Sequence, residues 1–97
     1  MKIRWLRAAL DTRYAQLDYI AQDSPSAAER LDGLIERQID ALADHPFMGR
    51  EGRVENSREV VITRTPFVAV YRVTESHIEI LRILHGAQQW PPPKADS

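Results

Sequence analysis

The dipeptide His45-Pro46 divides this chain into two halves with different hydrophobic periods. Before it, apolar residues recur every three or four positions, as they do on one face of an α-helix. After it, apolar residues come in short runs rich in β-branched and aromatic side chains, which favour strands. Because proline lacks an N–H donor and pushes the preceding residue out of the α region, no helix crosses this point. The sequence therefore predicts a helical half followed by a stranded half.

The helical half contains a short strand and two helices. Residues 2–5 alternate between polar and apolar side chains and predict a first strand, with Trp5 in the core. Residues 8–23 and about 25–44 each carry an apolar stripe flanked by charged residues, which is typical of an amphipathic helix. The short break between them predicts a helical hairpin.

Two N-caps for the second helix are compatible with the break. Ser24 can cap the helix with Pro25 at its first position, or Ser26 can cap it with Glu29 three residues later as a capping box. Both place the start of the helix within the same few residues.

The stranded half contains three runs, at residues 58–63, 67–73 and 78–84. Their short connectors predict an antiparallel meander, and the second run, apolar on both faces, predicts its central strand. Residues 46–57 hold two glycines among charged residues and predict a loop. The order strand, helix, helix, three strands predicts an α+β fold with both helices on one face of the sheet.

The length and composition predict one domain. The chain has 97 residues, of which 43% are hydrophobic and 28% charged. We therefore expect residues 1–90 to form a single domain and residues 91–97 to form a proline-rich polar tail. There is no cysteine, which excludes disulfides and thiolate zinc sites. No apolar run approaches the roughly 20 residues of a spanning helix, and charges interrupt the N-terminal segment. We therefore expect a cytoplasmic protein without membrane contact.

Metal, cofactor and small-molecule sites are not predicted. His45, His77 and His85 lack the paired spacing of metal ligands. The segment from Gly49 to Gly52 lacks the spacing and the strand-to-helix context of a phosphate-binding loop. We expect neither a metal nor a cofactor.

Arginine dominates the basic residues of the stranded half. The formal net charge is −1, but residues 49–97 carry a balance of +1 against −2 for residues 1–48. A guanidinium suits bidentate contact with a carboxylate or a phosphate. The arginines of this half are Arg50, Arg53, Arg58, Arg64, Arg72 and Arg82.

One candidate site combines Arg53, Arg58, Arg82 and His85, which the sheet could bring together. Arginines with one imidazole could cleave RNA, because guanidinium groups stabilise phosphorane charge and histidine transfers a proton. The same residues could instead form a socket for an acidic partner segment, which is the interpretation we favour.

Arg82 stands out within its strand. By simple alternation it shares a strand face with Ile78, Ile80 and Leu84. A lone charge in such a row predicts an edge of the core or a groove.

Several short segments, in this order and spacing, resemble toxins of the RelE/ParE superfamily. The resemblance covers about residues 3–90 and implies a compact toxin that is neutralised by a co-expressed antitoxin, whose extended and helical tail wraps the sheet and helices. The segments are Leu17-Asp-Tyr-Ile20, Ser24-Pro-Ser-Ala-Ala28, Leu42-Ala-Asp-His-Pro-Phe-Met-Gly-Arg50, Arg58-Glu-Val-Val61, Val70-Tyr-Arg-Val73 and Ile78-Glu-Ile-Leu-Arg-Ile-Leu-His-Gly86.

The superfamily divides by target. Its endoribonuclease members use basic residues on the meander strands, an arginine late in the sheet and a downstream tyrosine. Here the corresponding positions hold Glu59, Val61, Val68, Gln88 and Lys94, and none matches. The resemblance therefore favours the ParE branch, whose members poison DNA gyrase by binding it.

Three hypotheses follow. The first is a gyrase-binding toxin without catalytic residues, in which Arg53, Arg58, Arg72 and Arg82 contact the antitoxin. The second is a ribosome-dependent mRNA endonuclease that uses Arg58, Arg82 and His85. The third is an inactive relic that only binds its antitoxin.

Overall fold

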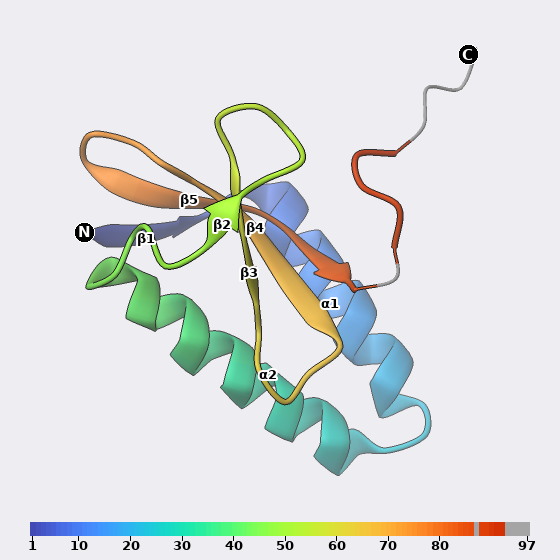
Figure 1. The fold of residues 1–97 in the computed structure, drawn as a ribbon. Coiled ribbons are helices and arrows are strands. Elements are labelled where there is room, and N and C mark those ends of the chain that lie inside the picture. The colour runs from blue at the N-terminus through green and yellow to red at the C-terminus, as the bar shows by residue number, and fades with distance from the viewer. Residues whose placement is uncertain (87, 93–97) are drawn as a thin grey trace.

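The computed structural model describes residues 1–86 and 88–92. Within them the chain forms two α-helices and one mixed five-stranded sheet, which confirms the predicted α+β fold (Figure 1). The part of the predicted polar tail beyond residue 92 lies outside the described residues. The elements are β1 (Lys2–Trp5), α1 (Arg7–Ala21), α2 (Pro25–Asp40), the 3-10 helix η1 (Ala41–Ala43), β2 (Arg50–Glu51), β3 (Arg58–Val61), β4 (Phe67–Val73) and β5 (His77–His85).

The two helices form the predicted hairpin, and Ser24 caps the second of them. Its Oγ accepts a hydrogen bond from the N–H of Ala27 at 3.2 Å, with Pro25 at the first helical position. This is the first of the two capping arrangements that the sequence allows. Both helices end slightly earlier than predicted, and η1 continues the turn up to the segment before His45. Neither α1 nor α2 has the length and apolar character that crossing a bilayer requires.

A charged cluster joins the two helices. The Arg13 side chain is only 8% exposed and lies 2.6 Å from Asp32 and 2.9 Å from Glu36. Its guanidinium also stacks 4.7 Å from the ring centroid of Trp5. Burial lowers the pKa of Arg13, but hydrogen bonds to the two carboxylates outweigh that effect and raise it. Arg13 therefore stays charged and fastens α1 to α2.

The strand order is β1-β5-β4-β3-β2, so β4 is central as predicted. β1 runs parallel to β5, and the other neighbours are antiparallel. The prediction of a loop throughout residues 46–57 is wrong at β2, where Arg50 lies opposite Glu59 and Glu51 opposite Arg58.

Both helices cover the same face of the sheet (Figure 1). The core between the layers is apolar, and both the helices and the strands contribute to it. The other face of the sheet carries no helix and is called the open face below. The buried cluster comprises Ala9, Leu17, Leu31, Ile35, Ile39, Leu42, Ile62, Phe67, Ala69, Tyr71, Ile78, Ile80 and Ile83.

A β-bulge interrupts β5. Tyr71 on β4 lies opposite Ile80, but the adjacent Val70 lies opposite Arg82, so Leu81 is the extra residue. A bulge shifts every later side chain of its strand to the other face. Because residues opposite each other share a face, Arg82 stands with Val70 on the open face.

The bulge corrects a sequence prediction. Simple alternation places Arg82 in one row with Ile78 and Ile80, and this is wrong because those two side chains face the helices. Arg82 does share its face with Leu84, and also with Glu79.

Candidate functional site

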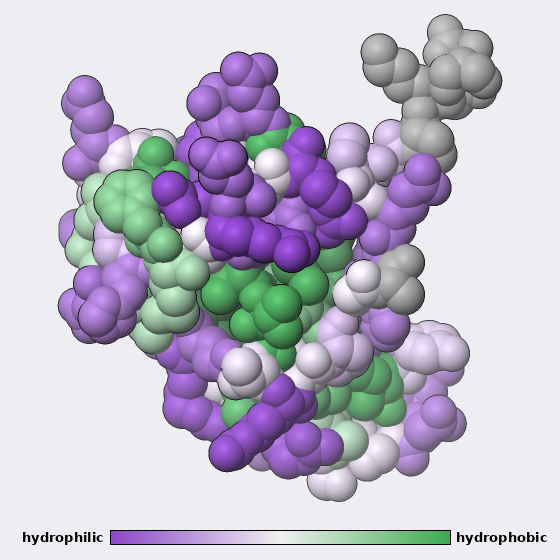
Figure 2. Space-filling model, in the orientation of Figure 1, coloured by the Kyte–Doolittle hydropathy of each residue, from purple (hydrophilic) through white to green (hydrophobic). Residues whose placement is uncertain are grey.

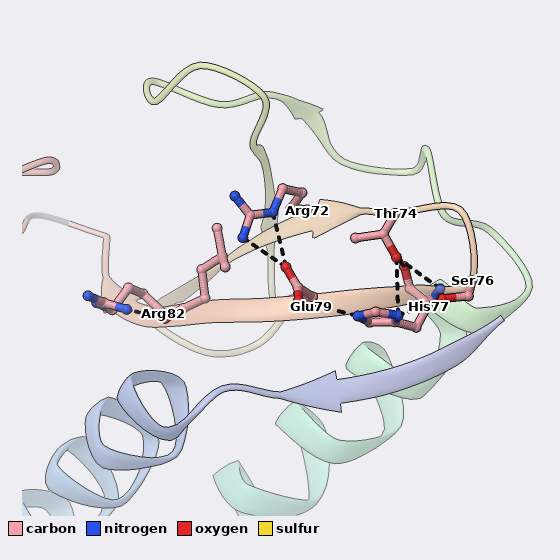
Figure 3. Close-up of polar contacts among 7 residues, drawn as sticks. Arg72, Thr74, Ser76, His77, Glu79 and Arg82 are labelled. Carbon is pink, nitrogen blue, oxygen red and sulfur yellow. Dashed lines mark hydrogen bonds and ion pairs between the residues drawn. The ribbon is translucent and has the colours of Figure 1, made fainter.

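The open face carries charged side chains that bind one another (Figure 3). Arg72 on β4 reaches across to Glu79 on β5, with its Nη2 at 2.8 Å and its Nε at 3.1 Å from Oε1. The Nε2 of His77 lies 3.3 Å from the other oxygen of the same carboxylate. Hydrogen bonding from Arg72, and then from His77, lowers the pKa of Glu79. Arg72 is therefore already bound within the chain.

The other nitrogen of His77 lies against two hydroxyl groups (Figure 3). Its Nδ1 is 3.1 Å from the Oγ1 of Thr74 and 2.9 Å from the Oγ of Ser76. Thr74 Oγ1 also donates to the His77 carbonyl and accepts from its N–H. These bonds close the turn between β4 and β5, so a structural role accounts for the cluster.

The open face also holds a buried carboxylate on β3, Glu59, which lies opposite Val70 of β4. The Glu59 side chain is 1% exposed, and its oxygens lie 2.8 Å from the N–H and 2.9 Å from the Nη2 of Arg53. Arg50 approaches to 3.8 Å. Burial raises the pKa of Glu59, but the hydrogen bonds and charge of Arg53 outweigh it, and the pKa lies below the ordinary value. Arg53 thus compensates a buried charge.

Two side chains fasten the loop that precedes β2. The Oη of Tyr71 donates to the carbonyl of Pro46 at 2.8 Å and accepts the N–H of Gly49, also at 2.8 Å. Arg58 donates to the Gly49 carbonyl at 2.7 Å, and its guanidinium stacks 4.8 Å from the Phe47 ring centroid. Burial raises the pKa of Tyr71. The hydrogen bonds from Tyr71 and Arg58 therefore hold the loop in one conformation.

This loop exposes two large apolar side chains. Phe47 is 65% exposed and Met48 is 52% exposed, although their backbone is fixed. A rigid presentation lowers the entropic cost of ordering such residues on binding. Two adjacent apolar residues within a predicted loop were the available sequence signal for this feature.

An apolar groove of about 380 Å³ runs between α2 and β3, beside this loop. Figure 2 shows hydrophobic side chains gathered in this region, framed by polar ones. Within the lining, Val61 is 58% exposed and Arg64 carries the charge. Sequence reasoning missed this groove because it forms only when a helix and a strand distant along the chain come together. Its lining residues are Leu34, Gln38, Ala41, Met48, Val60, Val61, Ile62, Thr63 and Arg64.

Arg82 lies on β5 opposite Val70, on the open face. Its Nη1 donates to the carbonyl of Leu81 at 2.6 Å, and its guanidinium lies 5.6 Å from the ring centroid of Trp90. The indole N–H of Trp90 is buried and meets no hydrogen-bond acceptor among the described residues. Trp90 thus packs against the sheet through Arg82.

The predicted site residues do not converge on one point. By register Arg58 and His85 lie opposite Tyr71 and Phe67, on the face toward the helices, whereas Arg82 stands on the open face. The four positions that separate Tyr71 from Phe67 along β4 span about 13 Å.

One hollow does bring two predicted arginines together. Arg58 and Arg72 line a space of about 660 Å³ beside the β2–β3 loop. Glu51 and Glu55 line the same hollow, so its charges are balanced. Among the residues that the structure describes, no group of three histidine, aspartate or glutamate side chains is placed to hold a metal ion.

The fold and its surfaces define a class of protein. It is a small α+β protein in which internal ion pairs stabilise the sheet and an apolar groove lies between α2 and β3. Comparison with known proteins identifies the family. The model of the "ParE toxin of type II toxin-antitoxin system, parDE" matches residues 3–90, and the chain belongs to this family of type II toxins.

Named relatives agree with this assignment. The chain is 40% identical to "Putative toxin Y4kP" of Sinorhizobium fredii over 90 residues, 93% of each protein. It is 36% identical to "Toxin RelE2" of Caulobacter vibrioides over 87 residues, 90% of this chain and 97% of the relative. A chain of the solved structure "Chromosomal ParDE TA system from P. aeruginosa" superposes with a TM-score of 0.78 at 31% identity, covering 88% of this chain and 95% of its own.

Proposed function

We propose that this toxin acts in the cytoplasm by binding DNA gyrase rather than by cleaving RNA, and that a cognate antitoxin neutralises it. One observation carries the choice of binding over catalysis: Arg58 and His85 lie on one face of the sheet and Arg82 on the other. General acid-base catalysis needs its groups within hydrogen-bond reach of one reacting phosphate. The family model, which is that of ParE toxins, supports the choice of gyrase.

The state of the arginines agrees with this proposal. Arg53 neutralises the buried Glu59, Arg72 is paired with Glu79, and Arg58 holds a loop carbonyl. A guanidinium already engaged in this way is poorly placed to stabilise a developing phosphorane. Such arginines can still share their remaining N–H groups with an acidic antitoxin, as predicted for Arg53, Arg58, Arg72 and Arg82.

The exposed apolar surface also suits a toxin that acts by binding. Phe47, Met48 and Val61 are large, apolar and more than half exposed. Apolar side chains held by a rigid backbone are the kind of residue on which most binding energy rests.

The experiment adds the toxin, released from its antitoxin, to a gyrase supercoiling reaction and to a ribosome-dependent mRNA cleavage reaction at matched concentrations. We expect inhibited supercoiling and intact mRNA. Adding back a stoichiometric amount of antitoxin restores supercoiling and serves as the control for specificity. Cleaved mRNA with normal supercoiling would refute the proposal in favour of the endonuclease.

A variant separates binding from catalysis further. If the toxin is an endonuclease, the double variant Arg82→Ala and His85→Ala no longer arrests growth. If the toxin binds gyrase, the double variant still arrests growth at the same expression level. Expression of the wild-type chain without growth arrest would instead identify an inactive relic.

A further inference from the structure

Three basic side chains of the open face have no carboxylate partner. They are Lys2 and Arg4 on β1, which are exposed, and Arg82 on β5, which is half-buried. No ion pair within residues 1–86 and 88–92 involves any of them. Their charges therefore do not serve to compensate an acid of the fold.

The register of the strands places these side chains on one face. In the parallel pairing of β1 with β5, Lys2 lies opposite His77 and Arg4 lies opposite Glu79. Residues opposite each other share a face of the sheet. Because Glu79 stands on the open face together with Arg82, all three cations point to that side.

The three cations form a stripe that runs along the strands. Lys2 and Arg4 are two residues apart on β1. Arg82 stands two positions beyond Arg4, since Glu79 and Arg82 lie opposite residues of β4 that are two apart. Two residues of a strand span about 7 Å, so the stripe is about 13 Å long. That length corresponds to about four phosphates of one strand of a DNA duplex, which rise about 3.4 Å each.

The carboxylates of the open face do not cancel this charge. Glu59 is bound by Arg53, and Glu79 is bound by Arg72. Each of these two acids already has an arginine of its own. The unpaired cations therefore leave the open face with a net positive charge.

The helical layer has the opposite sign. Residues 6–48 carry four arginines and eight carboxylates, a balance of −4. The formal net charge of −1 for the whole chain hides this separation. A polyanion is repelled by the helices and attracted by the open face, which orients its approach.

A hollow of about 780 Å³ opens beside the start of the stripe. Lys2 and Arg4 line it together with Ser76 and His77, and Met1 and Ile3 complete its lining. Figure 3 shows Ser76 and His77 at one end of β5 and Arg82 toward the other. Ammonium, guanidinium and hydroxyl groups are the usual protein ligands of a phosphate.

We propose that this stripe and its hollow bind the phosphodiester backbone of the DNA on which gyrase acts. The proposal rests on the proposed function and adds a contact with DNA to the contact with the enzyme. Phosphate contacts carry no sequence information. The toxin therefore contacts the DNA of the gyrase complex without regard to its sequence.

A protein partner suits this surface less well than a nucleic acid. Interfaces with DNA are more polar and much more positively charged than interfaces between proteins. Protein interfaces depend on large apolar side chains. Three such side chains, Phe47, Met48 and Val61, are more than half exposed, but they lie on β3 and in the loop before β2. In the strand order this side of the sheet is opposite to β1.

Direct binding to DNA tests the stripe in the absence of gyrase. The probe is a fluorescently labelled duplex of about 20 base pairs, and anisotropy is measured from about 50 to 200 mM KCl. Three phosphate contacts predict a loss of affinity of about fortyfold over this range. Lys2→Gln combined with Arg4→Gln should leave one contact and reduce that loss to about three- to fourfold.

A matched control removes the same charge from the helical layer. Arg7→Gln combined with Arg30→Gln changes two exposed residues, of which the Arg7 side chain is 89% exposed. It should leave the salt dependence as in the wild type, because neither residue lies on the open face. Equal losses in the two double variants would mean that net charge alone attracts DNA, which would overturn the stripe.

A supercoiling assay connects the stripe with the proposed target. We expect the Lys2→Gln, Arg4→Gln variant to need at least about fivefold more toxin for half-inhibition of gyrase. Its affinity for the full-length antitoxin, measured by calorimetry, should change less than about twofold. Lys2→Arg combined with Arg4→Lys keeps both charges and should inhibit gyrase like the wild type.

The outcomes separate the two proposals. A Lys2→Gln, Arg4→Gln variant that binds the duplex and inhibits gyrase like the wild type overturns the stripe and leaves the gyrase target intact. Normal supercoiling with the wild-type toxin overturns the gyrase target, while the duplex titration still decides whether the stripe binds DNA. An affinity for the antitoxin that falls as far as the affinity for DNA assigns the stripe to the antitoxin. Tighter binding of an RNA duplex of the same sequence overturns the choice of DNA.

Discussion

The two halves of β3 differ in how their outer edge is completed. At Arg58 and Glu59 the edge is paired with β2, a buried carboxylate lies over it and the loop before it is hydrogen-bonded in place. At Val60 and Val61 the edge has no strand partner among the described residues and borders an apolar groove. We call these the closed half and the open half of β3.

This difference shows which surface features stabilise the fold and which are available to bind a partner. Three of the six arginines of the stranded half belong to the closed half, where Arg50 and Arg53 approach the buried Glu59 and Arg58 donates to the Gly49 carbonyl. The open half contains few charges but leaves both apolar surface and backbone groups unsatisfied, which a partner can cover. We therefore expect substitutions in the closed half to change the free energy of unfolding, and substitutions in the open half to change binding.

The largest loss of stability is expected for Gly49→Ala in the closed half. An added Cβ would lie 2.7 Å from the Tyr71 hydroxyl and 2.8 Å from the Glu59 carbonyl. Because neither group can move without breaking the loop, we expect a loss of about 2–3 kcal/mol in the free energy of unfolding, measured by urea denaturation.

Gly33→Ala provides the control for that measurement. Gly33 is a helix-interior residue, and the added methyl group would meet only the flexible end of Arg37 at 3.1 Å. It should stabilise the protein by about 0.5–1 kcal/mol, because alanine has the higher helix propensity. Equal effects of the two substitutions would contradict the assignment of Gly49 to a closed half.

Tyr71→Phe should have the next largest effect. The change leaves the Gly49 N–H and the Pro46 carbonyl without the hydroxyl that bonds both. We expect a loss of about 1–2 kcal/mol, measured by urea denaturation, because a buried donor is left unsatisfied. Tyr14→Phe, at a residue that is 53% exposed, should leave the unfolding curve unchanged, and a comparable loss there would show that the effect is not specific to the loop.

Glu59→Gln should give a smaller loss, about 1 kcal/mol at neutral pH, because the amide retains one acceptor oxygen but loses the charge-assisted bonds to Arg53. The pKa of folded Glu59 lies below the ordinary carboxyl value of 4.5. Its ionised form therefore stabilises the fold above that pH, and this contribution is lost as the pH falls through the folded pKa.

The pH dependence of the difference between wild type and Glu59→Gln is the check on that prediction. Thermal unfolding measured from pH 7 downward should show the two proteins converging below about pH 4.5. Glu55→Gln, at an exposed position of the loop between β2 and β3, should follow the wild type throughout. A constant difference across the range would mean that the charge of Glu59 does not stabilise the fold.

The sequence predicted the fold well where local periodicity determines the structure. The two helices and the central position of Phe67–Val73 follow from patterns within each segment. The pattern allowed two caps for the second helix, and the structure has one of them, Ser24. The two-residue strand β2 lacks such a pattern, since it exists only through pairing with β3. The bulge at Leu81 likewise leaves the apolar run unchanged but reverses the face of Arg82.

The site was less accessible to sequence reasoning than the fold. The sequence singled out Arg53 and Arg58 as arginines, but their partners are a buried Glu59 and a loop carbonyl, which only the tertiary structure brings near. The free edge at Val61 depends on what its neighbours leave unpaired. A single sequence contains no pattern that identifies backbone groups left without a strand partner.

The smallest change in stability, and the sharpest test of the open half, is expected for Gln38→Ala. The variant loses the exposed hydrogen bonds that the Gln38 amide makes with the N–H and the carbonyl of Thr63, worth about 0.5 kcal/mol, and extends the free edge from Val61 to Thr63. A longer unpaired edge beside an apolar groove promotes pairing between molecules. We therefore expect concentration-dependent self-association, measured by sedimentation velocity, that exceeds that of the wild type.

Two further variants test this explanation. Gln38→Glu should show intermediate self-association, because its carboxylate still accepts the Thr63 N–H but cannot donate to the Thr63 carbonyl. Adding Val61→Pro to Gln38→Ala should reduce the association again, since it removes the central donor of the lengthened edge. If the alanine variant sediments like wild type, the Gln38 amide does not protect the edge, and the contrast between the two halves of β3 rests on the groove alone.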